Sequence, residues 1–166
     1  MPTGPEPPTS ELPPSVVRVV EAAQSLGLAI KPMLMQASTR TAQDAALACG
    51  CDVGQIVKSL LFVGSDSGRS YLLLVSGANR ADETAMAQIL GEKLKRPDAE
   101  AVRAITGFSI GGVPPFGHLQ RSPVLLDEAL LAFDVVWAAA GHPHAVFPIA
   151  PTSLARATDA KVAKMG

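Results

Sequence analysis

The sequence has few of the residues that would indicate a redox centre, a zinc site or a membrane segment. Its two cysteines, Cys49 and Cys51, are one residue apart, which suits neither a mutual disulfide nor a known zinc-binding spacing. The longest purely apolar runs, such as VVWAAA, are far too short to cross a bilayer. The first residues show no basic segment followed by an apolar one. We therefore expect a cytoplasmic protein without a membrane segment.

Charge is scarce as well. Charged residues make up 17% of the chain, the net charge is −1 and the isoelectric point is near 6.3. Such a protein lacks the overall positive field that drives non-specific binding to nucleic acids. Any contact with a nucleic acid must then be local or assisted by a partner protein.

Several familiar enzyme signatures are missing. The sequence has no GxSxG, P-loop, helix-opening GxGxxG or HExxH motif. Any catalysis by this chain must therefore use other groups.

The chain does contain enough apolar material for one folded domain. Hydrophobic residues make up 48% of its 166 residues, and a chain of this length buries a substantial core without a disulfide or a metal. Six of the 14 prolines fall within residues 1–14, which predicts a flexible, proline-rich arm. Residues 15–166 are expected to form a single domain.

Apolar periodicity and turn residues divide this domain into short elements. Two apolar runs flank GSDSG and predict a β-hairpin over 54–77, with its strands covered on both faces. Strands and a helical turn are expected within 123–140, with another strand in 145–149. Helices are expected in 16–26, 41–50, 82–91, 97–105 and 150–158. Because strands and helices do not alternate regularly, we predict an α+β fold with a mixed, mostly antiparallel sheet and short flanking helices.

Two polar residues stand beside apolar strand segments. Lys58 lies within QIVKSLLFV, where an ammonium must reach water, pair with an anion or face a cavity. It is either an edge lysine with its charge in solvent or a point charge for a phosphate or carboxylate. Asp127 follows PVLL and either takes part in catalysis or caps the next helical turn.

The loop SIGGVPPFGH, residues 109–118, joins glycines to prolines. Gly111, Gly112 and Val113 could present backbone N–H groups outward, while Pro114 and Pro115 hold the loop rigid. Preorganised donors of this kind stabilise the negative charge that develops in acyl transfer. The alternative is a stiff connector with no role in binding.

The three histidines raise the alternative of a metal site. His142 and His144 in GHPHAV, with His118 as a third ligand, could hold a metal, but no carboxylate-rich motif accompanies them and Pro143 disturbs strand geometry. A turn between two strands is favoured, from which one imidazole could still contact a substrate. We expect no metal and no cofactor.

Four stretches in this order resemble the YbaK/ProX family of aminoacyl-tRNA editing domains, which is related to the insertion domain of bacterial prolyl-tRNA synthetases. They are TAQDAALACGCDVGQIVKSLLF, RADETAMAQILG, AVRAITGFSIGGVPPFGH and SPVLLDEALL. The resemblance implies a single α+β editing domain. It also implies an enzyme that hydrolyses amino acids wrongly esterified to tRNA.

The resemblance further implies roles for individual residues. Lys58 would hold the terminal adenosine or its phosphate, and the GxxxP loop, from Gly111 through Gly112 to Pro115, would orient the ester carbonyl and a water. Asn79 and either His142 or His144 would bind substrate. An aminoacyl ester is already reactive, so positioning water, carbonyl and tRNA end is sufficient chemistry.

The expected substrate is a tRNA acceptor end, usually of tRNA for proline, that carries a small amino acid. Met33, Met35 and residues around Leu60 are expected to shape the pocket for that side chain. Prolyl-tRNA synthetase is a further expected partner. The competing hypothesis is a non-catalytic module that holds aminoacyl-tRNA or docks onto a synthetase.

Overall fold

Residues 12–165 are described by the computed structural model, so most of the predicted arm lies outside the described residues. The first helix, α1 (Pro14–Ser25), begins at the last residue of that arm, with proline in its first turn. One face of α1 is buried through Val16, Val19 and Ala23. The helix ends next to Gly27, whose φ of 78° only glycine adopts readily.

The next three helices begin and end as their sequences predict. They are α2 (Ala42–Cys49), α3 (Glu83–Leu90) and α4 (Ala99–Thr106). Each begins where a side-chain oxygen accepts a hydrogen bond from a backbone N–H of the first turn, and each ends at a glycine in the left-handed conformation. The capping residues are Thr41, Asp82 and Asp98. A last helix, α5 (Pro151–Thr158), starts with proline.

The strands form two sheets. The larger has the order β4-β2-β3-β5-β8, and the smaller has the order β1-β7-β6. The predicted hairpin is confirmed as β2 (Val57–Gly64) and β3 (Ser70–Ser76), which pair antiparallel. The other strands are β1 (Met33–Leu34), β4 (Leu94–Lys95), β5 (Val124–Asp127), β6 (Val136–Ala139), β7 (Ala145–Ile149) and β8 (Lys161–Ala163). Two short 3-10 helices, η2 (Val53–Gln55) and η3 (Glu128–Ala132), complete the elements.

The α+β class is confirmed, with both parallel and antiparallel pairs in the larger sheet. The strands of the protein form two sheets, however, whereas the sequence predicts a single one. The short strands β4 and β8 were not expected, because two or three residues carry no readable alternation. Coverage on both faces holds for all of β3, whereas β2 is only partly buried between Lys58 and Leu60.

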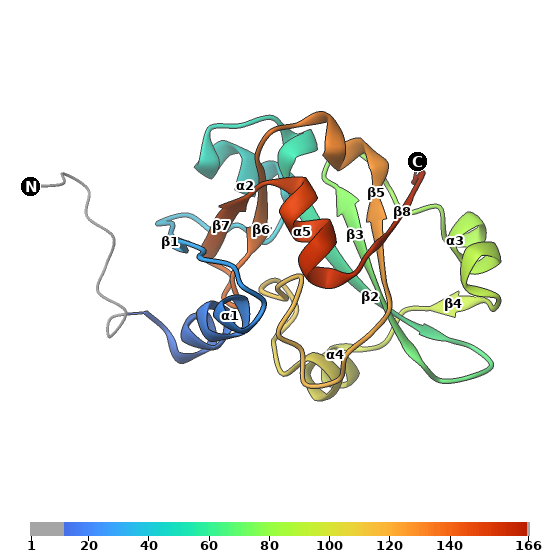
Figure 1. Cartoon of the computed structure of the whole chain (residues 1–166). Helices are drawn as coiled ribbons and strands as arrows, with labels where there is room; N and C mark the ends of the chain where they lie inside the picture. The colour runs from blue at the N-terminus through green and yellow to red at the C-terminus, as the bar shows by residue number, and fades with distance from the viewer. Residues whose placement is uncertain (1–11, 166) are drawn as a thin grey trace, which may run out of the picture.

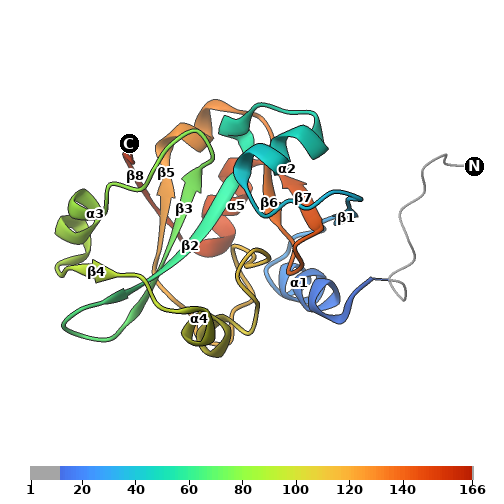
Figure 2. The same ribbon diagram turned by 180° about the vertical axis from the view of Figure 1, so that it is seen from behind.

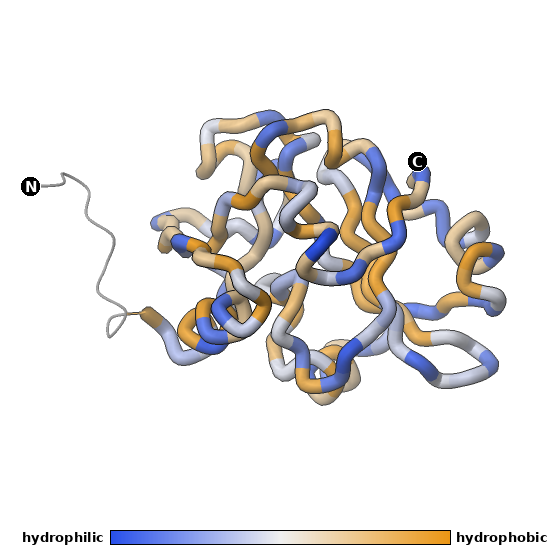
Figure 3. Tube along the Cα trace, in the orientation of Figure 1, coloured by the Kyte–Doolittle hydropathy of each residue, from blue (hydrophilic) through white to orange (hydrophobic). Residues whose placement is uncertain are grey.

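Two apolar cores lie on the two faces of the larger sheet. On one face, Val57 and Leu74 pack in a core that α1, α5 and the smaller sheet share. On the other face, Phe62 and Leu73 pack with Met86 of α3. Figures 1 and 2 show α1 and α3 at opposite ends of the molecule with the strands between them. Figure 3 shows hydrophobic segments along the central strands and hydrophilic segments in the outer connections.

The two sheets meet at one point. Ile56, just before β2, forms a single parallel bridge with Trp137 of β6. Beyond this bridge no further pairing joins β2 to β6 within residues 12–165. The strands therefore diverge from Ile56 and leave a wedge between the sheets.

Candidate functional site

A cavity of about 650 Å³ occupies this wedge. Ligand sites are usually about 300–1,000 Å³ in volume. Its walls are β2, β6, the start of α2 and part of the 109–118 loop. Three cations, Arg40, Lys58 and Arg96, line it, and among the described residues no aspartate or glutamate does. The cavity is therefore suited to an anionic or strongly polar ligand.

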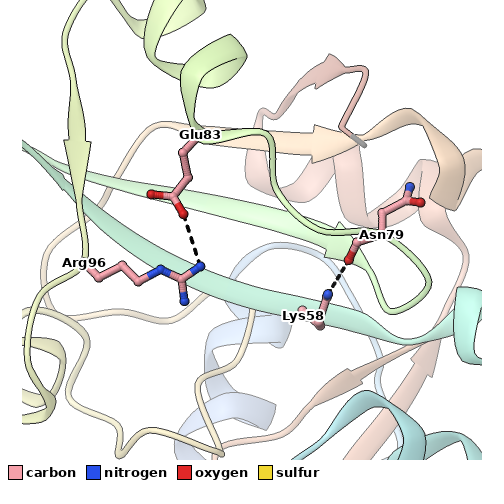
Figure 4. Close-up of polar contacts among 4 residues, drawn as sticks. All are labelled: Lys58, Asn79, Glu83 and Arg96. Atoms are coloured by element: carbon pink, nitrogen blue, oxygen red, sulfur yellow. Dashed lines mark hydrogen bonds and ion pairs between the residues drawn. The ribbon is translucent and has the colours of Figure 1, made fainter.

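Lys58 is anchored at one side of the cavity. Its ammonium donates a hydrogen bond to the backbone carbonyl oxygen of Asn79, in the connection that follows β3 (Figure 4). Partial burial lowers the pKa of Lys58, and the nearby charges of Arg80 and Arg96 lower it further, while Asp127 acts in the opposite direction. Burial and like charges both disfavour the charged ammonium, so an added anion in the cavity would stabilise it.

Asp127 helps to hold Asn79, the residue that anchors Lys58. The carboxylate is fully buried and accepts hydrogen bonds from the backbone N–H of Ser76, the side-chain amide of Asn79 and the N–H of Ala129, each at 3.0 Å. The last bond caps η3, which confirms the structural alternative given for Asp127. Because Asn79 holds both Asp127 and Lys58, the carboxylate fixes the residue that positions the lysine.

Arg96 directly follows β4 and reaches over Phe62 of β2. Its guanidinium pairs with Glu83 at 3.3 Å (Figure 4) and stands over the ring of Phe62 at 5.4 Å. The pair is largely exposed, so it adds little to stability and leaves the guanidinium available to a ligand. Arg96 belongs to the basic run KLKR, which by itself indicates a solvated face, and no local pattern marks Arg40, whose side chain lies against Gly111.

The 109–118 loop is closed at its base and open toward the cavity. Backbone bonds from Leu119 to Thr106 and from Gln120 to Ile105, at 3.1 and 2.9 Å, bring its two ends together. Gly111 and Val113 line the cavity. Within residues 12–165, neither of their N–H groups has a hydrogen-bond partner. Of the three residues expected to present N–H groups outward, Gly111 and Val113 are the ones whose N–H groups stay free.

Gly112 has another role. Its N–H, expected to point outward, donates to the carbonyl oxygen of Ser109 at 3.1 Å, so it is already occupied within the loop. A β-carbon at Gly112 would lie 2.8 Å from the backbone nitrogen of His142. Glycine is required here by the close approach of two backbones. The expected set of free donors is thereby corrected to Gly111 and Val113.

Pro115 faces away from Lys58. It lines a second cavity of about 340 Å³ behind the loop, together with residues of α1 and α5. His118 lines the same cavity, and its Nε2 donates to the Pro114 carbonyl oxygen at 2.6 Å. Burial lowers the pKa of His118. Pro115 and His118 therefore support the loop from behind.

His142 and His144 form the turn between β6 and β7, as the sequence favours. Their rings are 5.8 Å apart, and the Nδ1 of His142 accepts a bond from the N–H of His144 at 3.1 Å. The Nδ1 of His144 donates to the carbonyl oxygen of Met35 at 3.1 Å. Neither histidine lines the first cavity, although their turn packs against Gly112. Their expected contact with substrate stays a prediction.

Two other expectations concern the same surroundings. Leu60 lines the cavity, whereas Met33 and Met35 do not, so the expected contribution of these two methionines to the pocket wall is wrong and that of β2 at Leu60 is confirmed. Among residues 12–165, no three histidine, cysteine, aspartate or glutamate side chains are grouped as metal ligands. Within the same residues no helix has the length and apolarity to span a membrane.

The fold and this cavity define an α+β protein with a pocket whose cations and free backbone amides suit a polar or anionic ligand. The chain belongs to the aminoacyl-tRNA editing domain family, whose sequence model matches residues 36–157. This match confirms the resemblance seen in the sequence and the class of enzyme that it implies, an aminoacyl-tRNA editing hydrolase.

Individual relatives agree with this assignment. A solved structure described as "a putative trans-editing enzyme for prolyl tRNA synthetase" is 48% identical, with a TM-score of 0.89 over 93% of this chain and 98% of that one. The uncharacterized protein YwhH of Bacillus subtilis is 31% identical over 76% of this chain and 80% of its own length. The "putative Cys-tRNA(Pro)/Cys-tRNA(Cys) deacylase EbsC" of Enterococcus faecalis is 25% identical over 75% of this chain and 76% of its own.

Proposed function

We propose that this protein is a free-standing deacylase that removes a small amino acid wrongly esterified to tRNA, with tRNA for proline as the carrier. One observation carries the proposal: Lys58 and the free amides of Gly111 and Val113 line the same cavity. The names of the relatives support the carrier, since one is described as an editing enzyme for prolyl tRNA synthetase and another as a deacylase of Cys-tRNA(Pro).

In the proposed reaction, water attacks the carbonyl carbon of the aminoacyl ester. The N–H groups of Gly111 and Val113 bind the carbonyl oxygen as it becomes negative, and they need no reorganisation because the prolines and His118 fix the loop. The bond from the carbonyl carbon to the ribose oxygen then breaks. The ribose oxygen takes the proton that the water loses, with the neighbouring ribose hydroxyl as relay, and the products are a free amino acid and an intact tRNA.

The cations would hold the tRNA end. Lys58 and Arg40 lie beside the loop, where they can contact the phosphate of the terminal nucleotide. Such contacts compensate locally for a chain whose net charge is −1. Asn79 does not line the cavity, and we propose that it acts on substrate indirectly, through its bond to Lys58. His142 and His144 are proposed as secondary contacts at the rim beside Gly112.

Specificity would follow from the size of the pocket. The apolar wall around Leu60 favours small side chains and excludes large ones sterically. A methylene group in such a pocket changes the free energy of binding by only about 1–3 kcal/mol, so neighbouring small amino acids are separated by modest factors. Alanine, serine, cysteine and threonine are all candidate cargo.

A deacylation time course tests the proposal. Enzyme well below substrate concentration is mixed with tRNA for proline carrying alanine, serine, cysteine, threonine or 2-aminobutyrate. We expect many turnovers on at least one of these. Stoichiometric binding without turnover on all five would instead support the non-catalytic module.

Lys58→Met tests the role of the lysine. The loss of a hydrogen bond to a charged group, worth roughly 1.5–3 kcal/mol, predicts a decrease in kcat/KM of about 10- to 150-fold. The variant also loses the bond to the Asn79 carbonyl oxygen, so the free energy of unfolding should fall slightly, by about 0.5–1.5 kcal/mol. Lys31→Met, at an exposed position away from the cavity, is the matched control. Equal turnover by Lys58→Met and the control would remove Lys58 from the site.

A further inference from the structure

The cavity borders an edge of a strand rather than a face of a sheet. Successive side chains of a strand point to opposite faces, so a cavity on one face is lined by every second residue. Here every residue from Val57 to Phe62 lines it. Only the backbone edge of β2 gives such a continuous lining.

Hydrogen bonding shows which residues present their backbone at that edge. The N–H of Gly64 donates to the carbonyl oxygen of Arg69 at 2.9 Å, and the N–H of Gly77 donates to the carbonyl oxygen of Ile56 at 2.7 Å. In an antiparallel pair, bonded and non-bonded positions alternate, so the even-numbered residues of β2 pair with β3 and the odd-numbered ones point outward. Val63, which is odd, accordingly pairs with Lys95 of β4.

The outward edge is open at two residues. β4 covers β2 only from Val63 onward, and the bridge to Trp137 engages only its beginning. Between them, the backbone groups of Ser59 and Leu61 have no partner among residues 12–165. The Ser59 hydroxyl oxygen is buried and also lacks a partner within the same residues. Open strand edges are usually covered in folded proteins, so this one is available to a ligand.

We infer that the edge of β2 at Ser59 and Leu61 is a nucleobase site that binds adenine. The carbonyl oxygen of Ser59 accepts from the exocyclic amino group, and the N–H of Leu61 donates to an adjacent ring nitrogen. Adenine presents this amino group beside a ring acceptor, which matches the carbonyl and N–H that an open edge offers in sequence. The inference rests on the proposed function in that the adenine is that of the terminal nucleotide.

Charge and shape favour a base over the ammonium of the amino acid. An ammonium is donor-only and would leave the Leu61 N–H unpaired, and three cations with no carboxylate among the described lining residues would repel it. A neutral, flat base is not repelled by the cations, and its ring nitrogen can accept the bond from the Leu61 N–H. Pro97, Val102 and Ile110 supply apolar walls to the same cavity. Lys58 of the same strand and Gly111 line this cavity too, so the ribose and ester of the bound nucleotide would meet them there.

Binding of AMP and IMP to the full-length protein tests the site. The two nucleotides carry the same phosphate, so the cations contribute equally, but inosine replaces the donor amino group by an acceptor oxygen. A bidentate base contact discriminates by about 1–3 kcal/mol, which predicts that AMP binds roughly 5- to 150-fold more tightly. In amide NMR spectra, AMP should shift the Leu61 resonance strongly. Equal affinities, or a Leu61 amide that does not respond to AMP, would overturn the inference.

Ser59→Ala separates the backbone from the hydroxyl. It leaves the strand edge intact, so the preference for AMP over IMP should persist. Loss of that preference would assign base selection to the hydroxyl and overturn the backbone site. The deacylation time course is independent of these measurements: turnover with equal AMP and IMP affinities refutes only the nucleobase site, whereas AMP selectivity without turnover refutes only the deacylase.

Discussion

Two glycine-containing loops of this protein differ in whether their backbone N–H groups are hydrogen-bonded within the protein. In the hairpin turn, residues 64–69, every backbone N–H group has a hydrogen-bond partner, and two of these groups donate to one side chain. Glu92 accepts bonds from the Asp66 and Ser67 amides at 3.0 and 2.9 Å, and from the Ser67 and Tyr71 hydroxyls at 2.6 and 2.7 Å. The 109–118 loop, by contrast, leaves the Gly111 and Val113 amides without a partner among the described residues.

The difference shows how a loop can be rigid while its donors stay free. The hairpin turn is fixed by bonds to the same groups that would otherwise bind a ligand. The 109–118 loop is fixed from behind, through His118 and through Arg18 of α1, whose guanidinium donates to the Gly107 carbonyl oxygen at 2.6 Å and stacks over Phe108 at 4.5 Å. A saturated turn contributes stability alone, whereas a braced loop can also bind.

The largest effect on activity is expected from Gly112→Ala. The new β-carbon would stand 2.8 Å from the backbone nitrogen of His142, and neither backbone can yield without moving the loop. Displacement of a catalytic group by about 1 Å can cost roughly 100-fold in rate, so we expect a fall in kcat/KM of that order. Deacylation kinetics on the best substrate measure it.

Gly68→Ala in the hairpin turn is the comparison for this variant. Gly68 has a left-handed φ of 73°, which Gly112 lacks, but a β-carbon at Gly68 meets nothing within 4 Å. Strain of about 1–2 kcal/mol should lower the free energy of unfolding while kcat/KM is retained. Similar losses of activity in both variants would show that the 109–118 loop has no special place in the reaction.

His118→Ala should have a smaller effect. It removes the bond that fixes the Pro114 carbonyl without touching the cavity. One hydrogen bond is worth about 0.5–1.5 kcal/mol, so kcat should fall roughly three- to tenfold while KM changes little. His118→Gln keeps an N–H donor and should restore part of kcat. A loss seen in KM alone, or no rescue by glutamine, would refute the bracing role, and the neighbouring exposed Leu119→Ala is the control.

Much of the fold was predictable because its signals are local. Thr41, Asp82 and Asp98 begin helices and Gly50, Gly91 and Gly107 end them, and each works through contacts within four residues. The hairpin was equally predictable from its turn. The separation into two sheets was not, since it depends on Ile56 meeting Trp137, 81 positions away, at a single bridge.

The site was predictable in part for the same reason. Lys58 and the 109–118 loop were identified by residue types that are unusual in their local context, and both line the cavity. The engagement of Gly112 could not be read from the sequence, because its bond to Ser109 depends on the conformation of the loop. Arg40 and the open edge at Ser59 and Leu61 depend on how β2, β4 and β6 are placed, which no local pattern encodes.

The smallest effect on activity is expected from Glu92→Gln in the saturated turn. Hydrogen bonds from Ser67 and Tyr71 to the carboxylate lower the pKa of Glu92 from 4.5 to about 2. A carboxylate with a lowered folded-state pKa stabilises the protein above its unfolded pKa, and this contribution disappears as pH falls from about 4.5 to about 2. The difference in free energy of unfolding between wild type and Glu92→Gln should therefore be constant near neutral pH and shrink across this acidic window. Urea unfolding at several pH values measures it, with the exposed Glu21→Gln as control. A difference that does not vary with pH would show that the carboxylate charge contributes nothing to the turn, and a loss of deacylation at neutral pH would undo the contrast between a turn that only stabilises and a loop that binds.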